Sequence, residues 1–148
     1  MEHVEFTYTA GMDEDAVEER LRRTETGVLA LADGDDAYAV PLAVHYDGGD
    51  SLLLRLGRDA DSEKFAFVET TERACFVVYD YGSPRDSWSV LVTGELHPVA
   101  PTDDRYDDAA VNRAFPDLRV FDEDVAELDV ELYELRIETA TGRETLDG

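Results

Sequence analysis

The chain has 148 residues, 43% of them hydrophobic, and carries a net charge of −23 from 36 acidic and 13 basic residues. Its length suits one domain, residues 1–148, with a sizeable core, and its hydrophobic content is that of a globular protein. The charge excludes nucleic acids and anionic membrane surfaces as partners, because both are themselves negatively charged. No apolar run approaches the roughly 18 residues of a membrane-spanning helix, and the first residues lack a cationic segment, so we expect a soluble, cytoplasmic protein.

The excess of acid also predicts a dependence on salt. Lys64 is the only lysine, and the remaining basic residues are arginines. Like charges at this density repel one another and destabilise the folded chain, whereas molar salt shortens the Debye length to about 3 Å and removes most of that repulsion. The composition resembles that of proteins from salt-in halophiles, so we expect a halophilic protein.

The predicted elements begin with a helix over residues 13–23. Acidic residues crowd its first turn and arginines its last, which matches the helix dipole. From Gly27 onward the pattern is that of strands separated by turns rich in Gly and Asp. The expected strands cover residues 28–32, 38–46, 51–56, 73–79, 87–99 and 130–138, and further helices are expected over residues 61–70 and 103–115.

Six strands at short spacing, with few helices between them, indicate a mostly antiparallel β-barrel. Pro41 falls inside the second strand, which predicts a sheet edge, a bulge or a barrel corner there. The sixth strand is expected to end at Thr141-Gly142-Arg143. A barrel of this size is filled by its own side chains, so a large ligand is expected outside it, against strand edges or at a subunit interface.

The loop that follows the third strand is the first candidate for a ligand site. It concentrates Arg55, Arg58, Ser62 and Lys64 close to the expected start of a helix. An ammonium group is a good point-charge partner for a phosphate, and a helix start adds N–H donors and the positive end of the helix dipole. These residues predict a phosphate site, with a solvated loop as the alternative. The P-loop and dinucleotide-binding glycine patterns are both missing from the sequence.

A second candidate lies at the start of the fifth strand, where Trp88, the only tryptophan, is followed by Ser89. Beside a planar ligand, Trp88 supplies a wall and Ser89 a hydrogen bond. The alternative is that the indole belongs to the hydrophobic core, as a single tryptophan often does.

The remaining reactive side chains favour structural roles. Cys75 lies in an apolar run and is expected to be a small buried hydrophobe, and as the only cysteine it has no partner for an internal disulfide. His45 and His97 have no Ser or Cys at the spacing of a hydrolase motif. The acidic runs lack the pattern of a calcium-binding loop, and no metal site is expected.

A set of ordered segments resembles a known family. The segments are Thr26-Gly27-Val28-Leu29-Ala30, Ala37-Tyr38-Ala39-Val40-Pro41-Leu42, Leu52-Leu53-Leu54-Arg55, Ser62-Glu63-Lys64, and Trp88-Ser89-Val90 with Gly94. Their order and spacing resemble the pyridoxamine 5'-phosphate oxidase-like FMN-binding split barrels, and most of all the small branch that includes the nitroimidazole-resistance type proteins. The likeness spans about residues 10–100, and the ending at 141–143 is similar to that branch's usual ending.

The resemblance implies a split β-barrel of about six antiparallel strands with two or three short flanking helices. It also implies a homodimer that holds two FMN molecules at its interface and acts on a small-molecule substrate. Ser62 and Lys64 match the family's Ser-x-Lys phosphate ligands, and Arg55 matches the basic or histidine position that ends the third strand. Arg58 is included as their neighbour.

The same resemblance places the isoalloxazine ring of the flavin near Trp88, Ser89 and the strand of Pro41. Arg55 stands where the nitroimidazole-resistance type has histidine, which separates this chain from that reduction chemistry. The substrate-phosphate residues of true pyridoxamine phosphate oxidases have no match here, which argues against vitamin B6 oxidation.

We therefore expect an FMN-dependent oxidoreductase that acts on an unidentified small organic substrate, with no catalytic residue assigned. Three alternatives stay open. They are a non-catalytic flavin carrier or sensor, a reductase that uses deazaflavin F420 in the same groove, and an interaction module that has lost its cofactor.

Overall fold

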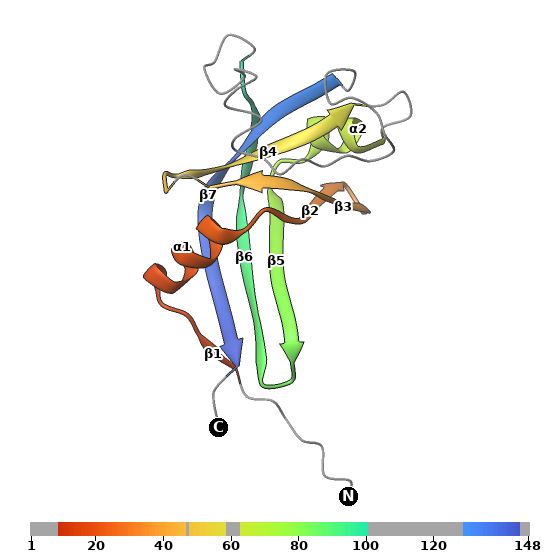
Figure 1. Cartoon of the computed structure of the whole chain (residues 1–148). Helices are drawn as coiled ribbons and strands as arrows, with labels where there is room; N and C mark the ends of the chain where they lie inside the picture. The colour runs from red at the N-terminus through yellow and green to blue at the C-terminus, as the bar shows by residue number, and fades with distance from the viewer. Residues whose placement is uncertain (1–8, 47, 59–62, 101–128, 146–148) are drawn as a thin grey trace, which may run out of the picture.

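The fold is that of a computed structural model, which describes residues 9–46, 48–58, 63–100 and 129–145 (Figure 1). The described residues form, in chain order, β1 (Thr9–Gly11), α1 (Glu14–Arg23), β2 (Thr26–Asp33), β3 (Asp36–His45), β4 (Ser51–Arg58), α2 (Glu63–Thr70), β5 (Ala74–Ser83), β6 (Asp86–Pro98) and β7 (Asp129–Thr145). The helix expected over residues 103–115 lies outside the described residues. No helix in the described ranges is long and apolar enough to cross a membrane.

All strands belong to one antiparallel sheet in the order β1-β7-β4-β3-β2-β5-β6, and β6 also pairs with β7. This last pairing closes the sheet into a barrel, which confirms the expected mostly β fold. Of the two or three short flanking helices expected, two lie in the described residues. Figure 1 shows β5, β6 and β7 as long strands that run side by side, with β2, β3 and β4 crossing near their upper part. The lower halves of the long strands therefore extend beyond the barrel as a ribbon.

The strand β7 is longer than the sequence pattern predicted. It continues through Gly142, which pairs with Val90 of β6, and ends at Thr145. Gly142 was expected to end the strand, but its role is to make room for a neighbour. A Cβ atom at this position would lie 2.7 Å from the Met12 sulfur and 3.1 Å from a methyl of Val17, so the missing side chain is what lets α1 pack against β7.

At Pro41, strand β3 pairs with a neighbouring strand on one side only. Pro41 stands opposite Val28 of β2, whereas the pairing of β3 with β4 covers only Ala43 to His45. Proline lacks the backbone N–H that a fully paired position uses, so it is tolerated where one neighbour is absent. The expectation of a local sheet edge at Pro41 is confirmed.

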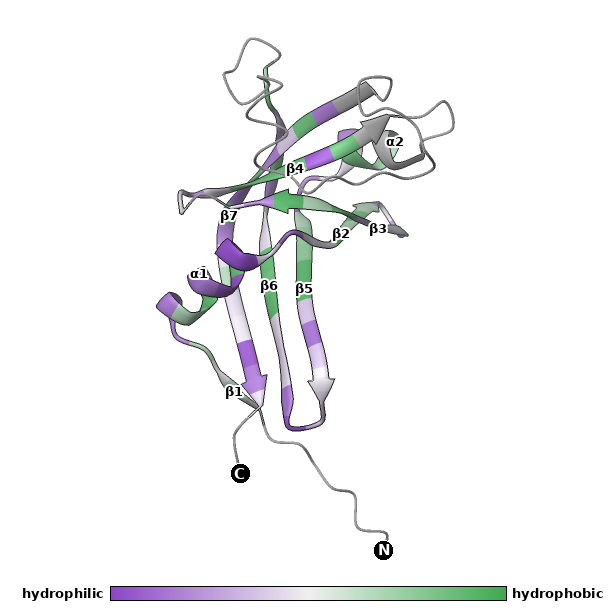
Figure 2. Ribbon diagram, in the orientation of Figure 1, coloured by the Kyte–Doolittle hydropathy of each residue, from purple (hydrophilic) through white to green (hydrophobic). Residues whose placement is uncertain are grey.

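The core fills the barrel and continues beneath α1. Its largest fully buried side chains are Phe76, Leu29, Leu52, Leu54, Leu56, Leu132, Leu135, Val90 and Val92. Figure 2 shows the corresponding hydrophobic colour in the middle of β5 and β6 and a hydrophilic outer side on α1. The helix adds Val17 and Leu21 to this cluster. Each such side chain contributes roughly 1.5–3 kcal/mol by leaving water, which is the main force holding α1 in place.

Candidate functional site

Arg55 is the best-defined member of the predicted phosphate site. It lies in β4 between Ala43 of β3 and Leu132 of β7, which are both buried, and its own side chain is partly buried. Within the described ranges no hydrogen bond or ion pair to its guanidinium is found. In a chain with 36 acidic residues this is unexpected, because a partly desolvated cation is stabilised by an anion nearby. The position of Arg55 therefore suits an anionic ligand.

The backbone brings two further basic positions to the same end of the barrel. Arg58 ends β4, and Lys64 lies in the first turn of α2. Ser62 lies outside the described residues. Arg58 and Lys64 therefore lie close to Arg55 along the chain.

The far end of α2 is fixed to the barrel by two contacts. The rings of Tyr38 and Phe67 stack with centroids 5.1 Å apart. Just after the helix, the Thr71 hydroxyl accepts a hydrogen bond from Ala32 N–H at 3.1 Å and lies 3.1 Å from the Ala32 carbonyl oxygen. These contacts hold α2 against β2 and β3, which sets where its amino-terminal turn lies relative to β4.

Pro41 and Ser89 lie on the outer face of the sheet. The register places Pro41, Val28, Val77, Leu91 and Thr141 in one row across five strands. Because side chains alternate along a strand, Ser89 shares this face with its second neighbour Leu91. Arg55 shares it with Pro41 through Ala43, its partner on β3.

Several large side chains on this outer face are open to water. Tyr79, which stands opposite Ser89, is 67% exposed, and Tyr81 and Leu91 are 63% and 43% exposed. Isolated exposed hydrophobic residues are common, but these three lie on the same face of two adjacent strands. We call this area, formed by Tyr79, Tyr81, Leu91 and the row described above, the outer sheet face.

Trp88 points the other way from Ser89. It packs against the core cluster on the side covered by α1, where the guanidinium carbon of Arg20 lies 4.7 Å from the centroid of the indole ring. The alternative interpretation, that Trp88 belongs to the hydrophobic core, therefore holds for much of its side chain. One ring face is covered by an arginine, and the indole is still only partly buried.

The two predicted constellations lie beside different parts of β7. Leu132 stands opposite Arg55 at one end of β7, and Arg143 stands opposite Ser89 eleven residues further along the same strand.

A family model described as "Pyridoxamine 5'-phosphate oxidase" matches residues 13–144, which is most of the chain. The chain belongs to the pyridoxamine 5'-phosphate oxidase family. No curated protein matches it.

Several solved structures have the same fold. An FAD-binding protein of Mesorhizobium loti has a TM-score of 0.74 and 17% identity, over 93% of this chain and 99% of that one. An FAD-binding protein of Mycobacterium smegmatis has a TM-score of 0.64 and 15% identity, over 94% and 100%. A candidate 5-nitroimidazole antibiotic resistance protein of Bacteroides thetaiotaomicron has a TM-score of 0.64 and 17% identity, over 97% and 95%. At these identities the likeness shows the fold.

In this member of the pyridoxamine 5'-phosphate oxidase family, Cys75 is less buried than expected. It lies on the outer sheet face between Ala30 and Thr93 and is partly exposed. Partial burial raises the pKa of its thiol, because the thiolate loses hydration. His97 lies 3.3 Å from the Glu95 carboxylate, and His45 also has an interaction partner. Cys75, His45 and His97 are therefore still interpreted as structural residues.

Sequence reasoning missed a cavity between α1 and the turn that joins β3 to β4. Its lining comes from three separate parts of the chain, namely α1, the segment 46–50 and β7, and it carries no motif. The one local signal is on α1, where Val17 and Leu21 form the apolar stripe and Glu14 and Glu18 flank it.

Proposed function

We propose that the protein binds FMN non-covalently as a homodimer and acts as a flavin-dependent oxidoreductase on a small organic substrate. Family membership and the FAD-binding proteins among its structural neighbours support a flavin ligand. The observation that carries the proposal within this chain is Arg55, a partly buried guanidinium with no acidic partner among the described residues.

The phosphate of FMN is proposed to bind Arg55, Ser62 and Lys64, with Arg58 close by. Two or three cationic groups and a hydroxyl match the charge and the acceptors of a phosphate dianion. The start of α2 adds backbone N–H donors and a positive dipole end at Lys64.

The isoalloxazine ring is proposed to lie near Pro41 of one subunit and near Trp88 and Ser89 of the second. The resemblance to split barrels that hold their cofactor at a dimer interface supports this division between two subunits. The outer sheet face supplies an apolar surface for such an association, since Tyr79, Tyr81 and Leu91 are exposed there. Ser89 and Pro41 lie on that same face.

A bound flavin supplies two-electron redox chemistry, and the protein binds it, orients it and limits the access of water. The chain offers no residue to which we assign proton transfer. A non-catalytic flavin carrier or sensor uses the same site without turnover, and a deazaflavin F420-dependent reductase uses the same groove. FAD is the further candidate cofactor that the structural neighbours suggest.

The test is the visible absorption spectrum of the protein purified in molar KCl, followed by acid release and chromatographic identification of the chromophore. The proposal predicts a yellow protein that releases one FMN per subunit and sediments as a dimer. Release of FAD or F420 instead changes the cofactor but keeps the site. A colourless monomer that takes up none of the three cofactors contradicts the proposal and favours the interaction module. A yellow protein that no electron donor reduces favours the carrier.

A further inference from the structure

Tyr79 is the most exposed of the large hydrophobic residues that the structure describes, at 67%. It stands directly opposite Ser89 in the pairing of β5 with β6. Residues that oppose each other in an antiparallel pair have Cβ atoms about 4.5–5.5 Å apart and project from the same face of the sheet. The phenol ring of Tyr79 and the hydroxyl of Ser89 are therefore neighbours on the outer sheet face.

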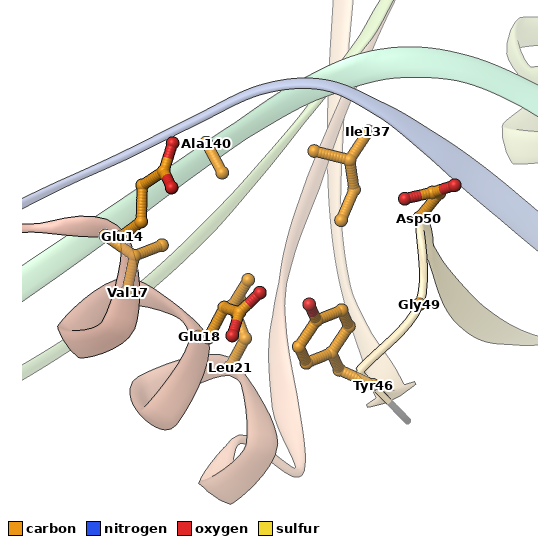
Figure 3. Close-up of a pocket in the computed structure, with 9 residues that line it drawn as sticks. All are labelled: Glu14, Val17, Glu18, Leu21, Tyr46, Gly49, Asp50, Ile137 and Ala140. Atoms are coloured by element: carbon orange, nitrogen blue, oxygen red, sulfur yellow. The ribbon is translucent and has the colours of Figure 1, made fainter.

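The other face of the long strands is covered by α1. Figure 3 shows Val17 and Leu21 of this helix directed toward the sheet, and both are buried in the core cluster. Trp88 lies on this covered side, where Arg20 occupies one face of its ring. A ligand that reaches the hydroxyl of Ser89 therefore approaches from the outer sheet face, on the side away from Trp88.

The outer sheet face also differs from the rest of this acidic chain in its charge. On β5 and β6 its side chains form four opposed pairs, namely Cys75 with Thr93, Val77 with Leu91, Tyr79 with Ser89, and Tyr81 with Ser87. None of the eight is acidic, although Asp and Glu make up 36 of the 148 residues. Charged residues are depleted where a surface is covered by a partner. The composition of these pairs therefore indicates a face that is covered in the functional protein.

We propose that Tyr79 packs against the isoalloxazine ring of the flavin, in the subunit that supplies Ser89. The inference rests on the proposed flavin site. A fused tricyclic ring that accepts a hydrogen bond from the Ser89 hydroxyl is wider than the spacing of about 5 Å between opposed Cβ atoms, so it also meets the neighbouring phenol. Tyr79 thus supplies the aromatic wall that the sequence indicated for Trp88, whose ring is held beneath α1.

A contact with the ring has a different signature from a contact with the phosphate. Aromatic pairs gain free energy from stacked or edge-to-face arrangements in addition to the area that they bury. Riboflavin and FMN share the isoalloxazine ring, so the contribution of Tyr79 is the same for both. The basic cluster at Arg55 and Lys64 instead contributes to FMN alone, because riboflavin lacks the phosphate.

The experiment is a calorimetric titration of the full-length protein with riboflavin and with FMN in molar KCl. Tyr79→Ala is expected to weaken the binding of both flavins by the same factor, about three- to tenfold, because it removes the aromatic contact. Tyr79→Phe keeps the ring and is expected to bind both flavins nearly as tightly as the wild type. Because Tyr79 is exposed, neither substitution disturbs the core, and far-UV circular dichroism checks that the fold is intact.

Tyr81→Ala separates a contact with the flavin ring from a role in subunit association. Tyr81 is 63% exposed on the same face, but it stands opposite Ser87, one pair further along the two strands from Ser89. Each variant is titrated at a concentration at which sedimentation shows it to be a dimer, and Tyr81→Ala is expected to bind riboflavin with nearly wild-type affinity. Equal losses in Tyr79→Ala and Tyr81→Ala overturn the assignment of Tyr79.

Two further outcomes distinguish this inference from the proposed function. If the wild type binds both flavins and Tyr79→Ala binds them equally well, or loses affinity for FMN alone, Tyr79 does not contact the ring and the flavin site stands without it. If the wild type binds neither flavin, the proposed function and the role of Tyr79 are both overturned.

Discussion

The guanidinium carbon of Arg20 lies 4.7 Å from the centroid of the Trp88 ring, so a cation of α1 covers one face of the only tryptophan. The contact joins the first helix to the lower part of β6. Arg22 of the same helix lies over the ring of Tyr46, which directly follows β3. Two arginines of α1 therefore contact aromatic rings from two different parts of the sheet. Guanidinium groups stack on aromatic rings well, because they are planar and weakly hydrated.

Replacing this arginine is expected to loosen α1. Arg20→Ala should lower the free energy of unfolding by about 1 kcal/mol and shift the fluorescence of Trp88 to longer wavelength, because water replaces the guanidinium over the ring. Urea unfolding followed by fluorescence measures both effects. Arg23→Ala is the control, since the Arg23–Glu19 ion pair is exposed and should contribute little. Equal effects of the two substitutions contradict a specific role for the Arg20–Trp88 contact.

Gly94 is expected to be irreplaceable at the point where β6 and β7 shift register. A Cβ atom there would lie 1.8 Å from the Arg136 carbonyl oxygen, which is backbone and has no room to move. Gly94→Ala should therefore destabilise the fold by more than about 2 kcal/mol, within the range seen for severe steric conflict. Gly11→Ala is the matched control, because a Cβ at Gly11 has no atom within 4 Å. Thermal melting that gives the same midpoint for both variants contradicts the bulge geometry.

Cys75 should react slowly with thiol reagents at mildly alkaline pH. Partial burial raises the pKa of its thiol, and only the thiolate is nucleophilic. At pH 8 the folded protein should be alkylated by iodoacetamide more slowly than the urea-unfolded chain. The rate should continue to rise with pH beyond the point at which the unfolded chain levels off. Mass spectrometry of timed samples gives both rates, and equal rates at pH 8 rule out the shift.

FMN affinity should depend on the basic cluster at the end of the barrel. Arg55→Gln and Lys64→Ala are each expected to weaken FMN binding more than tenfold, because each removes a charge-assisted hydrogen bond to the phosphate. Fluorescence-quenching titration of FMN measures the affinity. Arg73→Ala, which removes an exposed arginine paired with Glu138 at 2.7 Å, should leave it unchanged. Riboflavin, which lacks the phosphate, should bind the wild type and the variants equally, and a variant that weakens both ligands alike has lost its fold rather than its phosphate site.

The sequence predicts the features that depend on a local residue pattern. It does not predict the features that depend on contacts between residues far apart in the chain. The acid-to-base gradient located α1, and alternation with glycine-rich turns located β2, β3 and β4. The end of β7 was misplaced because Gly142 is a strand residue whose missing side chain makes room for Met12 and Val17, a contact that no local pattern contains.

In the candidate site, too, some features follow from local sequence and others depend on tertiary contacts. Arg55, Arg58 and Lys64 are close together in sequence, and the structure places their backbones at one end of the barrel. The opposite directions of Trp88 and Ser89 also follow from strand alternation. The contact of Trp88 with Arg20 depends on how α1 docks, and the cavity depends on three segments that meet only in the folded chain.

The charge of −23 makes a prediction for the whole chain, namely that stability rises with KCl. At 0.01 M salt the Debye length is about 30 Å and nearly all carboxylates repel one another, whereas at 1 M it is about 3 Å and only immediate neighbours do. We expect the thermal midpoint to increase steeply between these concentrations and then level off as screening becomes complete. Sucrose is the control, because it favours compact states by exclusion from the surface without screening charge. If sucrose stabilises as much as KCl, or if the midpoint falls as KCl rises, charge repulsion does not limit the fold and the halophilic interpretation fails.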